Sequence, residues 1–174
     1  RIERHVVNVL IFTSEARTAI IFRVDLALSL IKDGHNVLIA SPDFTDSQRE
    51  ALINLGITPV CYRGSRVEIS LLGLSKSLID YNHILKTFQI DLIITSFFRS
   101  IFLTTIISFF FKVKIIFMFE GLGSPFMKAK KFKAIAQKRI ATIIYKIAMT
   151  RGTCSIFLNA ADKQELATKV RQRT

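Results

Sequence analysis

The sequence predicts an α/β protein built on a doubly wound, mostly parallel β-sheet. Short runs of Val, Ile, Leu and Phe alternate with longer segments of helical period, as in successive β-α-β units. Each short run is nearly continuously apolar, which is typical of strands that helices cover on both faces. The 174 residues are 50% hydrophobic with only 3 Pro, so the chain can bury a full core and a disordered chain is excluded.

Six short runs fit the expected strands, whereas the strands of a sandwich would alternate between apolar and polar residues. The expected strands are Val6–Phe12, Asn36–Ala40, Ile57–Tyr62, Asp91–Thr95, Lys114–Phe119 and Thr153–Leu158.

The segments between these runs have helical period. The expected helices are Ala19–Lys32, Ser47–Asn54, Leu72–Phe88, Arg99–Phe110, Lys130–Met149 and one that begins near Ala161. Gly34 follows the first helix as a C′ residue, and Thr45 with Gln48 forms a capping box for the second. Six strands joined by five crossovers fit the order 3-2-1-4-5-6 in one domain, residues 1–174. Such sheets bind ligands beyond the carboxyl ends of their strands.

The charge of the chain indicates a polyanionic partner. Lys and Arg total 25 against 13 acidic residues, which gives a formal charge of +12. Nucleic acid, phosphate-bearing substrates and an anionic membrane face all fit this balance. The two cysteines, Cys61 and Cys154, lie far apart without CxxC spacing, so the sequence favours a reducing compartment and predicts no disulfide scaffold and no metal site.

The loop after the first expected strand, Thr13–Arg17, is a candidate substrate-binding segment. It lacks the G-x-G-x-x-G pattern of dinucleotide-binding domains, and the chain also lacks a P-loop, so no cofactor is predicted. The hydroxyls of Thr13 and Ser14 and the guanidinium of Arg17 are expected to hold a diphosphate or a sugar at a helix N-terminus. The alternative is an N-cap with solvated flanks.

The loop that begins at Glu120 contains the candidate catalytic residue. Glu120 follows a bulky apolar strand and is the only acid between Asp91 and Asp162, in a stretch with eleven Lys or Arg. Its carboxylate suits a sugar contact or a general base, and Gly121 and Gly123 allow the backbone to approach a ligand. The alternative is a turn with a salt-bridged glutamate. Ser96 and Arg99, at the end of another expected strand, complete the expected substrate-binding set.

A third feature combines phenylalanines with lysines. Residues 97–119 contain eight of the fifteen phenylalanines, too many for one core-facing stripe, and a basic amphipathic segment follows. This pattern predicts contact with anionic lipid. The expected contact residues are Phe109, Phe110, Lys128, Lys130, Lys131, Lys133 and Arg139. The alternative is a solvated basic face over an ordinary core helix. No uncharged run is longer than Ser100–Phe111, which is shorter than the ~20 residues of a spanning helix.

Two further classes receive little support. Nucleic-acid binding would use the same charge, but the sequence has no RNP motif, zinc finger or basic-region heptads. A serine hydrolase would need a G-x-S-x-G elbow, which is also missing.

Four segments together carry a family resemblance. They are Thr13-Ser14-Glu15-Ala16-Arg17, Ser41-Pro42-Asp43-Phe44, Glu120-Gly121-Leu122-Gly123 and Phe157-Leu158-Asn159. With them the chain resembles the N-terminal half of a retaining family-4 glycosyltransferase of the GT-B type. It is most similar to the branch that extends undecaprenyl-diphosphate-linked sugars in O-antigen and lipopolysaccharide assembly, including enzymes that add N-acetylgalactosamine in α-1,3 linkage.

The resemblance implies that residues 1–174 form a Rossmann-like acceptor-binding domain of a hexosyltransferase, inactive alone. A C-terminal domain outside this chain would bind the nucleotide-sugar donor, UDP-GalNAc, and carry the family's E-x7-E arrangement. The enzyme would be cytoplasmic and peripheral on the inner face of the bacterial inner membrane. Two departures from the family are visible: Glu120 stands where many relatives have a histidine, and Ser14-Glu15-Ala16 replaces a glycine-rich loop. The alternatives are a non-catalytic membrane-adhesion module and, less favoured, a basic nucleic-acid-binding domain.

Overall fold

The computed structural model describes residues 5–64, 71–121 and 132–171, which form six strands and six helices. The strands are β1 (Asn8–Phe12), β2 (Asn36–Ser41), β3 (Thr58–Cys61), β4 (Leu92–Ser96), β5 (Lys114–Phe119) and β6 (Cys154–Phe157). The helices are α1 (Ala16–Lys32), α2 (Asp46–Asn54), α3 (Leu71–Thr87), α4 (Phe98–Ile107), α5 (Phe132–Arg151) and α6 (Ala160–Arg171).

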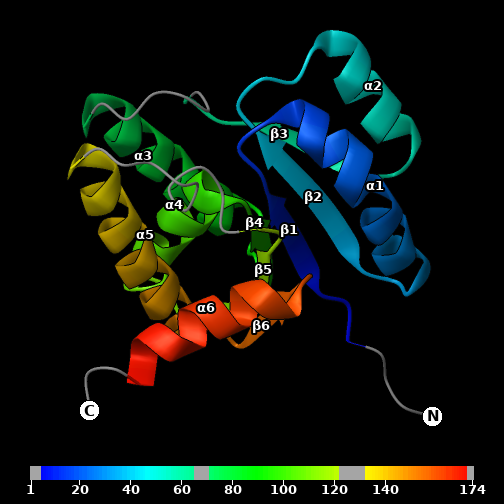
Figure 1. Ribbon diagram of the computed structural model, residues 1–174. Coiled ribbons are helices and arrows are strands. Elements are labelled where there is room, and N and C mark those ends of the chain that lie inside the picture. The colour runs from blue at the N-terminus through cyan, green and yellow to red at the C-terminus, as the bar shows by residue number, and fades with distance from the viewer. Residues whose placement is uncertain (1–4, 65–70, 122–131, 172–174) are drawn as a thin grey trace.

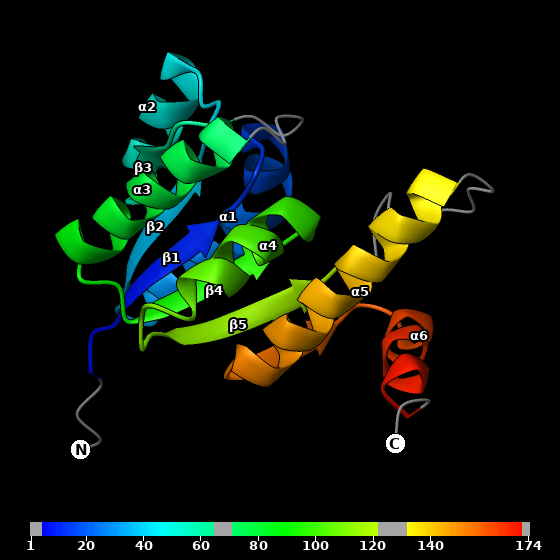
Figure 2. The ribbon, with the colours of Figure 1, turned by 90° about the vertical axis from the view of Figure 1, so that its left-hand side faces the viewer.

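All six strands pair in parallel in one sheet, and the order β3-β2-β1-β4-β5-β6 is the predicted one. Helices α1 and α2 cover one face of this sheet, while α3, α4 and α5 cover the other (Figures 1 and 2). The predicted fold class, a doubly wound α/β domain, is therefore confirmed.

Successive residues of the central strands enter two different cores, which explains their continuous apolarity. Val9 and Ile11 of β1 pack toward α1, whereas Leu10 and Phe12 pack toward α3 and α4. All four side chains are at most 1% exposed. A strand buried on both faces needs apolar residues at every position, and this is the pattern from which the sheet was predicted.

The local signals at two helix ends are confirmed. Gly34 lies after α1 with φ +91°, and its N–H donates to Ile31 O at 2.9 Å. Thr45 and Gln48 form the predicted capping box at the start of α2. The predicted helix Arg99–Phe110 is too long: α4 ends at Ile107, and Phe110 N–H instead donates to Ile107 O in a tighter turn.

An aromatic stack supports the carboxyl end of the sheet on the α3 side. The ring of Phe12 lies between Tyr62 and Tyr81, with centroid distances of 4.8 and 3.9 Å. The Tyr81 and Thr104 hydroxyl oxygens are 2.9 Å apart, so the buried phenol is hydrogen-bonded. Burial raises the pKa of Tyr62, Tyr81 and Tyr145 above the ordinary value.

None of the helices, over the part of each that the structure describes, is both long and apolar enough to span a bilayer.

Candidate functional site at the carboxyl edge of the sheet

The ends of the parallel strands bring several polar loops to one edge. These are Thr13–Ser14 after β1, the loop from Ser41 to Asp43 after β2, Arg63–Gly64 after β3, Ser96–Phe97 after β4 and Glu120–Gly121 after β5. Because all strands point the same way, side chains far apart in sequence meet here. They form two groups, one around Arg23 and one around Tyr62.

The first group is an ion pair that sequence reasoning missed. Arg23, on α1, is only 5% exposed. Its Nη2 donates to Ser96 Oγ at 3.0 Å and to Glu120 Oε1, while its Nη1 donates to Phe22 O at 2.9 Å. One guanidinium therefore joins α1 to the ends of β4 and β5.

Glu120 consequently has a buried partner. Its side chain is 10% exposed, and its charge is balanced by Arg23. The salt-bridged glutamate that stood as the alternative is the arrangement present. Oε2 of Glu120 accepts no hydrogen bond from the described residues, so one carboxylate oxygen is still able to accept from a ligand. Catalysis by Glu120 stays a prediction.

A signal for Arg23 exists in the sequence. The buried positions of α1 are Ala16, Ala19, Arg23 and Ala27, which follow one stripe at helical spacing. An arginine on a stripe of alanines faces the sheet and needs a buried carboxylate. Glu120, a solitary acid after an apolar strand, is the carboxylate that the sequence offers as its partner.

The second group begins with Asp43, which caps α1 from the neighbouring loop. Asp43 Oδ1 accepts from Ala16 N–H at 2.7 Å and from Ser41 Oγ at 2.8 Å. The contact satisfies one of the N–H groups that a helix leaves open at its start. Ser14, two residues before α1, is 6% exposed, and its hydroxyl makes no hydrogen bond within the described part of the chain.

Tyr62 borders Arg99, because a Cβ on Gly64 would lie 3.4 Å from Tyr62 Cε2 and 3.2 Å from Arg99 Nη2. Its hydroxyl donates to Thr13 O at 2.8 Å. Burial raises the pKa of Tyr62, the positive charge of Arg99 opposes that rise, and the negative charge of Asp43 adds to it. Both charges therefore act on the same phenol, which contacts the Thr13 carbonyl directly after β1.

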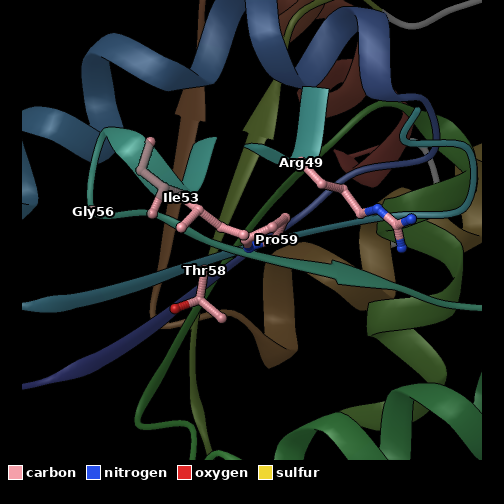
Figure 3. Close-up of a pocket in the computed structure, with 6 residues that line it drawn as sticks. Arg49, Ile53, Gly56, Thr58 and Pro59 are labelled. Atoms are coloured by element: carbon pink, nitrogen blue, oxygen red, sulfur yellow. The ribbon is translucent and has the colours of Figure 1, made fainter. Parts of the chain in front are cut away.

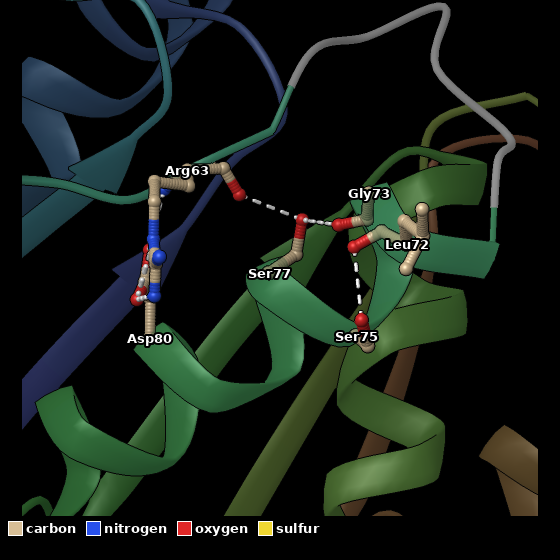
Figure 4. Close-up of polar contacts among 6 residues, drawn as sticks. All are labelled: Arg63, Leu72, Gly73, Ser75, Ser77 and Asp80. Carbon is tan, nitrogen blue, oxygen red and sulfur yellow. Dashed lines mark hydrogen bonds and ion pairs between the residues drawn. The ribbon is translucent and has the colours of Figure 1, made fainter.

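The loop after β3 is fastened to α3 (Figure 4). Arg63 Nη2 donates to Asp80 Oδ1 at 2.7 Å, and Arg63 N–H donates to Asp80 Oδ2 at 2.7 Å. Ser77 Oγ lies 2.8 Å from Arg63 O and 3.4 Å from Arg99 Nη2. A Cβ on Gly64 would approach Ser77 Oγ to 2.6 Å and Arg99 Nη2 to 3.2 Å, so a glycine there leaves room for Arg99.

The backbone is strained between the two groups. Phe97, which joins β4 to α4, has φ +64° and ψ 148°, a conformation that is ordinarily reserved for glycine. It lies between Ser96, which accepts from Arg23, and the first turn of α4, which carries Arg99. Such strain is found at ligand-binding positions more often than elsewhere.

The predicted substrate residues are thus divided. Ser14 and Arg99 belong to the group around Tyr62, whereas Ser96 and Glu120 belong to the group around Arg23. Arg17 is exposed in the first turn of α1. Gly121 has φ +109° with open space around it, which suits the predicted close approach. Gly123 lies outside the described residues.

The predicted membrane residues do not all come together. Phe109 and Phe110 are 58% and 77% exposed, but they follow α4 at the amino edge of the sheet. There the Arg151 guanidinium carbon lies 4.4 Å from the ring centroid of Phe109. Arg139 is twelve residues away from Arg151 along α5, which is about 18 Å. Lys128, Lys130, Lys131 and the side chain of Lys133 lie outside the described residues.

A hollow at the β3 edge of the sheet contains none of the predicted residues (Figure 3). Its volume is about 560 Å³, and it is lined by Arg49, Ile53, Gly56, Ile57, Thr58 and Pro59. Arg49 forms an exposed ion pair with Asp46 within α2. Across the described ranges, no three His, Cys, Asp or Glu side chains are grouped so that they could hold a metal ion.

Comparison with known proteins defines the fold. No family model matches the chain, and no curated protein matches it in sequence. It is similar in structure to sucrose-phosphate synthase from Thermosynechococcus elongatus (TM-score 0.71, 12% identity, 95% of this chain and 46% of that one). It is also similar to a glycosyltransferase from Rickettsia africae ESF-5 (0.64, 17%, 93% and 39%) and to a UDP-N-acetylglucosamine 2-epimerase (0.66, 13%, 97% and 46%).

The chain therefore has the Rossmann-like fold of one domain of GT-B glycosyltransferase-like structures. It spans less than half the length of each of these three structures. Because an epimerase shares the fold with transferases, the likeness defines the architecture and not the reaction.

Proposed function

We propose that this chain is the acceptor-binding domain of a retaining GT-B glycosyltransferase. The observation that carries the proposal is the set of polar groups at the carboxyl edge of a sheet with this fold. Ser14, Arg17 and Arg99 supply hydroxyl and cationic groups there, and Glu120 supplies a carboxylate oxygen. An acceptor that carries both a diphosphate and sugar hydroxyls matches this combination.

The finer assignment rests on the resemblance of Glu120-Gly121-Leu122-Gly123 to one branch of the family. In this assignment, the enzyme transfers N-acetylgalactosamine from UDP-GalNAc to a sugar on undecaprenyl diphosphate during O-antigen assembly. A second domain would bind the nucleotide and stabilise the charge of the departing diphosphate. This chain would hold the acceptor hydroxyl in place for attack on the donor sugar.

Glu120 is assigned a contact with the acceptor through Oε2, because Oε1 is taken by Arg23. The ion pair with Arg23 holds the carboxylate in position. A carboxylate held in this way can orient a sugar hydroxyl through a hydrogen bond. Arg17 and Arg99 are assigned to the diphosphate, since guanidinium groups bind phosphate oxygens in pairs.

The assay for this proposal uses the natural protein that contains residues 1–174. It is incubated with UDP-GalNAc and a short-chain polyprenyl-diphosphate N-acetylglucosamine, and the disaccharide product is measured by mass spectrometry. We expect transfer, with a large loss in the Glu120→Gln variant, which keeps the size of the side chain. Absence of transfer with UDP-GalNAc and other UDP-hexosamines would overturn the proposal.

The exposed face of α5 favours a second candidate function, adhesion to a membrane without substrate contacts. Ile140 and Ile143 are 57% and 56% exposed and lie beside the exposed Arg139. Apolar and basic residues on one helix face suit the inner face of the bacterial inner membrane. In a sedimentation assay, binding to vesicles with anionic lipid but not to neutral vesicles supports adhesion. No binding to anionic vesicles would end this part of the proposal.

A further inference from the structure

We infer that Asp43, Ser14 and Arg99 form a sugar-phosphate site over the end of β1, in which Asp43 accepts from sugar hydroxyls and Arg99 binds the phosphate. The inference rests on the proposed function and deepens it. It adds a second carboxylate, that of Asp43, to the sugar contact assigned to Glu120.

Asp43 has one oxygen engaged and one open. Oδ1 accepts from Ala16 N–H at 2.7 Å and Ser41 Oγ at 2.8 Å, which fixes the orientation of the carboxylate. Oδ2 accepts no hydrogen bond from the described residues, and the side chain is exposed. No side chain of the described residues forms an ion pair with it, so its charge is balanced there by the amino end of α1 and not by a cation.

Glu120 differs from Asp43 in this respect. Its charge is balanced by a buried guanidinium, and 10% of its side chain is exposed. A carboxylate that already accepts a charged hydrogen bond gains less from a sugar hydroxyl than one that forms no ion pair. Asp43 is therefore the stronger acceptor for hydroxyl groups.

Ser14 adds a hydroxyl that lacks a partner. The residue is 6% exposed, and its hydroxyl makes no hydrogen bond among the described residues. The hydroxyl oxygen is not sealed from solvent, so a ligand oxygen can reach it. Ser14 directly follows Thr13, whose carbonyl accepts from Tyr62 at 2.8 Å, so its position over β1 is fixed.

Arg99 supplies the positive charge that would bind the phosphate. Ser77 Oγ lies 3.4 Å from its Nη2, and Gly64 leaves the space that the guanidinium occupies. A Cβ on Gly64 would lie 3.2 Å from Arg99 Nη2 and 3.4 Å from Tyr62 Cε2, so Arg99 borders Tyr62. The Tyr62 hydroxyl contacts Thr13 O, and Asp43 contacts Ala16 N–H three residues further along, so both charged groups flank the loop after β1. A ligand that reaches both must present hydroxyl donors at one end and an anionic group at the other, which is the chemistry of a sugar phosphate.

The experiment is calorimetric titration of the natural protein that contains residues 1–174 with N-acetylglucosamine 1-phosphate, inorganic phosphate and free N-acetylglucosamine. We expect the sugar phosphate to bind at least tenfold more tightly than phosphate. Asp43→Asn keeps an oxygen for Ala16 N–H, so its melting temperature should stay near that of the wild type. This variant should bind the sugar phosphate no better than phosphate, with its phosphate affinity unchanged.

Three further variants complete the test. Arg99→Gln should lose at least tenfold in affinity for both anions, and Arg99→Lys, which keeps the charge, should recover most of it. The matched control is Asp25→Asn, at an exposed aspartate of α1, which should bind as the wild type does. Equal affinity of the wild type for sugar phosphate and phosphate would overturn the inference. An Asp43→Asn variant that binds like the wild type would overturn it as well.

The outcomes separate this inference from the proposed function. If the sugar phosphate binds through Asp43 but the natural protein transfers no sugar, the inference stands and the proposed function fails. If sugar is transferred while Asp43→Asn changes neither binding nor turnover, the proposed function stands and the inference fails.

Discussion

The guanidinium of Arg23 and the carboxylate of Glu120 form a buried ion pair between residues that are 97 positions apart. Arg23 belongs to the first crossover helix, and Glu120 ends the fifth strand. Ser96, at the end of β4, accepts from the same Nη2 at 3.0 Å. The pair therefore joins the two halves of the sheet at its carboxyl edge.

Removal of one partner should destabilise the protein strongly. Glu120→Ala leaves the guanidinium of Arg23 buried and unpaired, which costs about 3–5 kcal/mol in free energy of unfolding. The double variant Arg23→Met with Glu120→Met removes both charges and should lose less than the two single Met variants together. Urea unfolding gives the free energy of unfolding of Glu120→Ala, the two single Met variants and the double variant, each compared with the wild type. Additive losses would show that the two side chains are not coupled.

The three tyrosines should resist ionisation while the protein is folded. Burial raises the pKa of Tyr62, Tyr81 and Tyr145, so each phenol stays neutral at pH about 10.5, where an exposed tyrosine is mostly ionised. Because the folded pKa exceeds the unfolded one, the stabilisation is complete below pH about 10 and is lost as the pH rises. A near-ultraviolet titration should show tyrosinate only as the protein unfolds. Gradual ionisation of any tyrosine in the folded protein would contradict the buried positions.

Stability should also fall in acid through Asp80. The hydrogen bond from Arg63 holds the pKa of Asp80 below its ordinary value. A lowered folded pKa gives stability above pH about 4, which is lost as the pH falls through the folded pKa. Since the Arg63 side chain is 61% exposed, we expect Asp80→Asn to cost at most about 1 kcal/mol at pH 7.

The measurement for Asp80 is urea unfolding of the wild type and Asp80→Asn across the acid range. The difference between them should shrink below pH about 4. A difference that stays constant into strong acid would mean that the charge of Asp80 contributes nothing.

Glycine should be better than alanine at position 97. The φ of +64° and ψ of 148° at Phe97 strain any residue with a Cβ by about 1–3 kcal/mol. Glycine lacks this strain but has a larger unfolded-state entropy, which costs about 0.5–1 kcal/mol. Phe97→Gly should therefore exceed Phe97→Ala in free energy of unfolding by about 1 kcal/mol. The reverse order in urea unfolding would exclude strain at this position.

The fold was predictable because its signals are local. Every expected strand is present, and the strand order follows from the short crossovers between parallel strands. The end of α4 was missed because apolar residues continue through Phe110 after the helix has ended at Ile107. Apolar residues occur both in the helix and in the turn that follows it, so the hydrophobic pattern alone does not mark the end of the helix.

The site was predictable only in part. The loops that reach the carboxyl edge follow from the topology, and Ser14, Ser96, Arg99 and Glu120 do lie there. Which of them pair with each other depends on contacts between distant segments, such as the 97-residue separation of Arg23 and Glu120. Phe109 follows α4 and precedes β5, whereas α5 begins after β5. The two segments therefore lie at opposite edges of the sheet, although they are close in the sequence.

The two exposed cysteines lie on the outermost strands, Cys61 in β3 and Cys154 in β6. Five interstrand spacings of about 4.8 Å separate them, so thiol-reactive spin labels would be about 24 Å apart before linker length is added. The distance between labels on the two native cysteines therefore measures the width of the sheet without any introduced mutation. A change in this distance when a molecule binds would show that the outer strands move relative to each other.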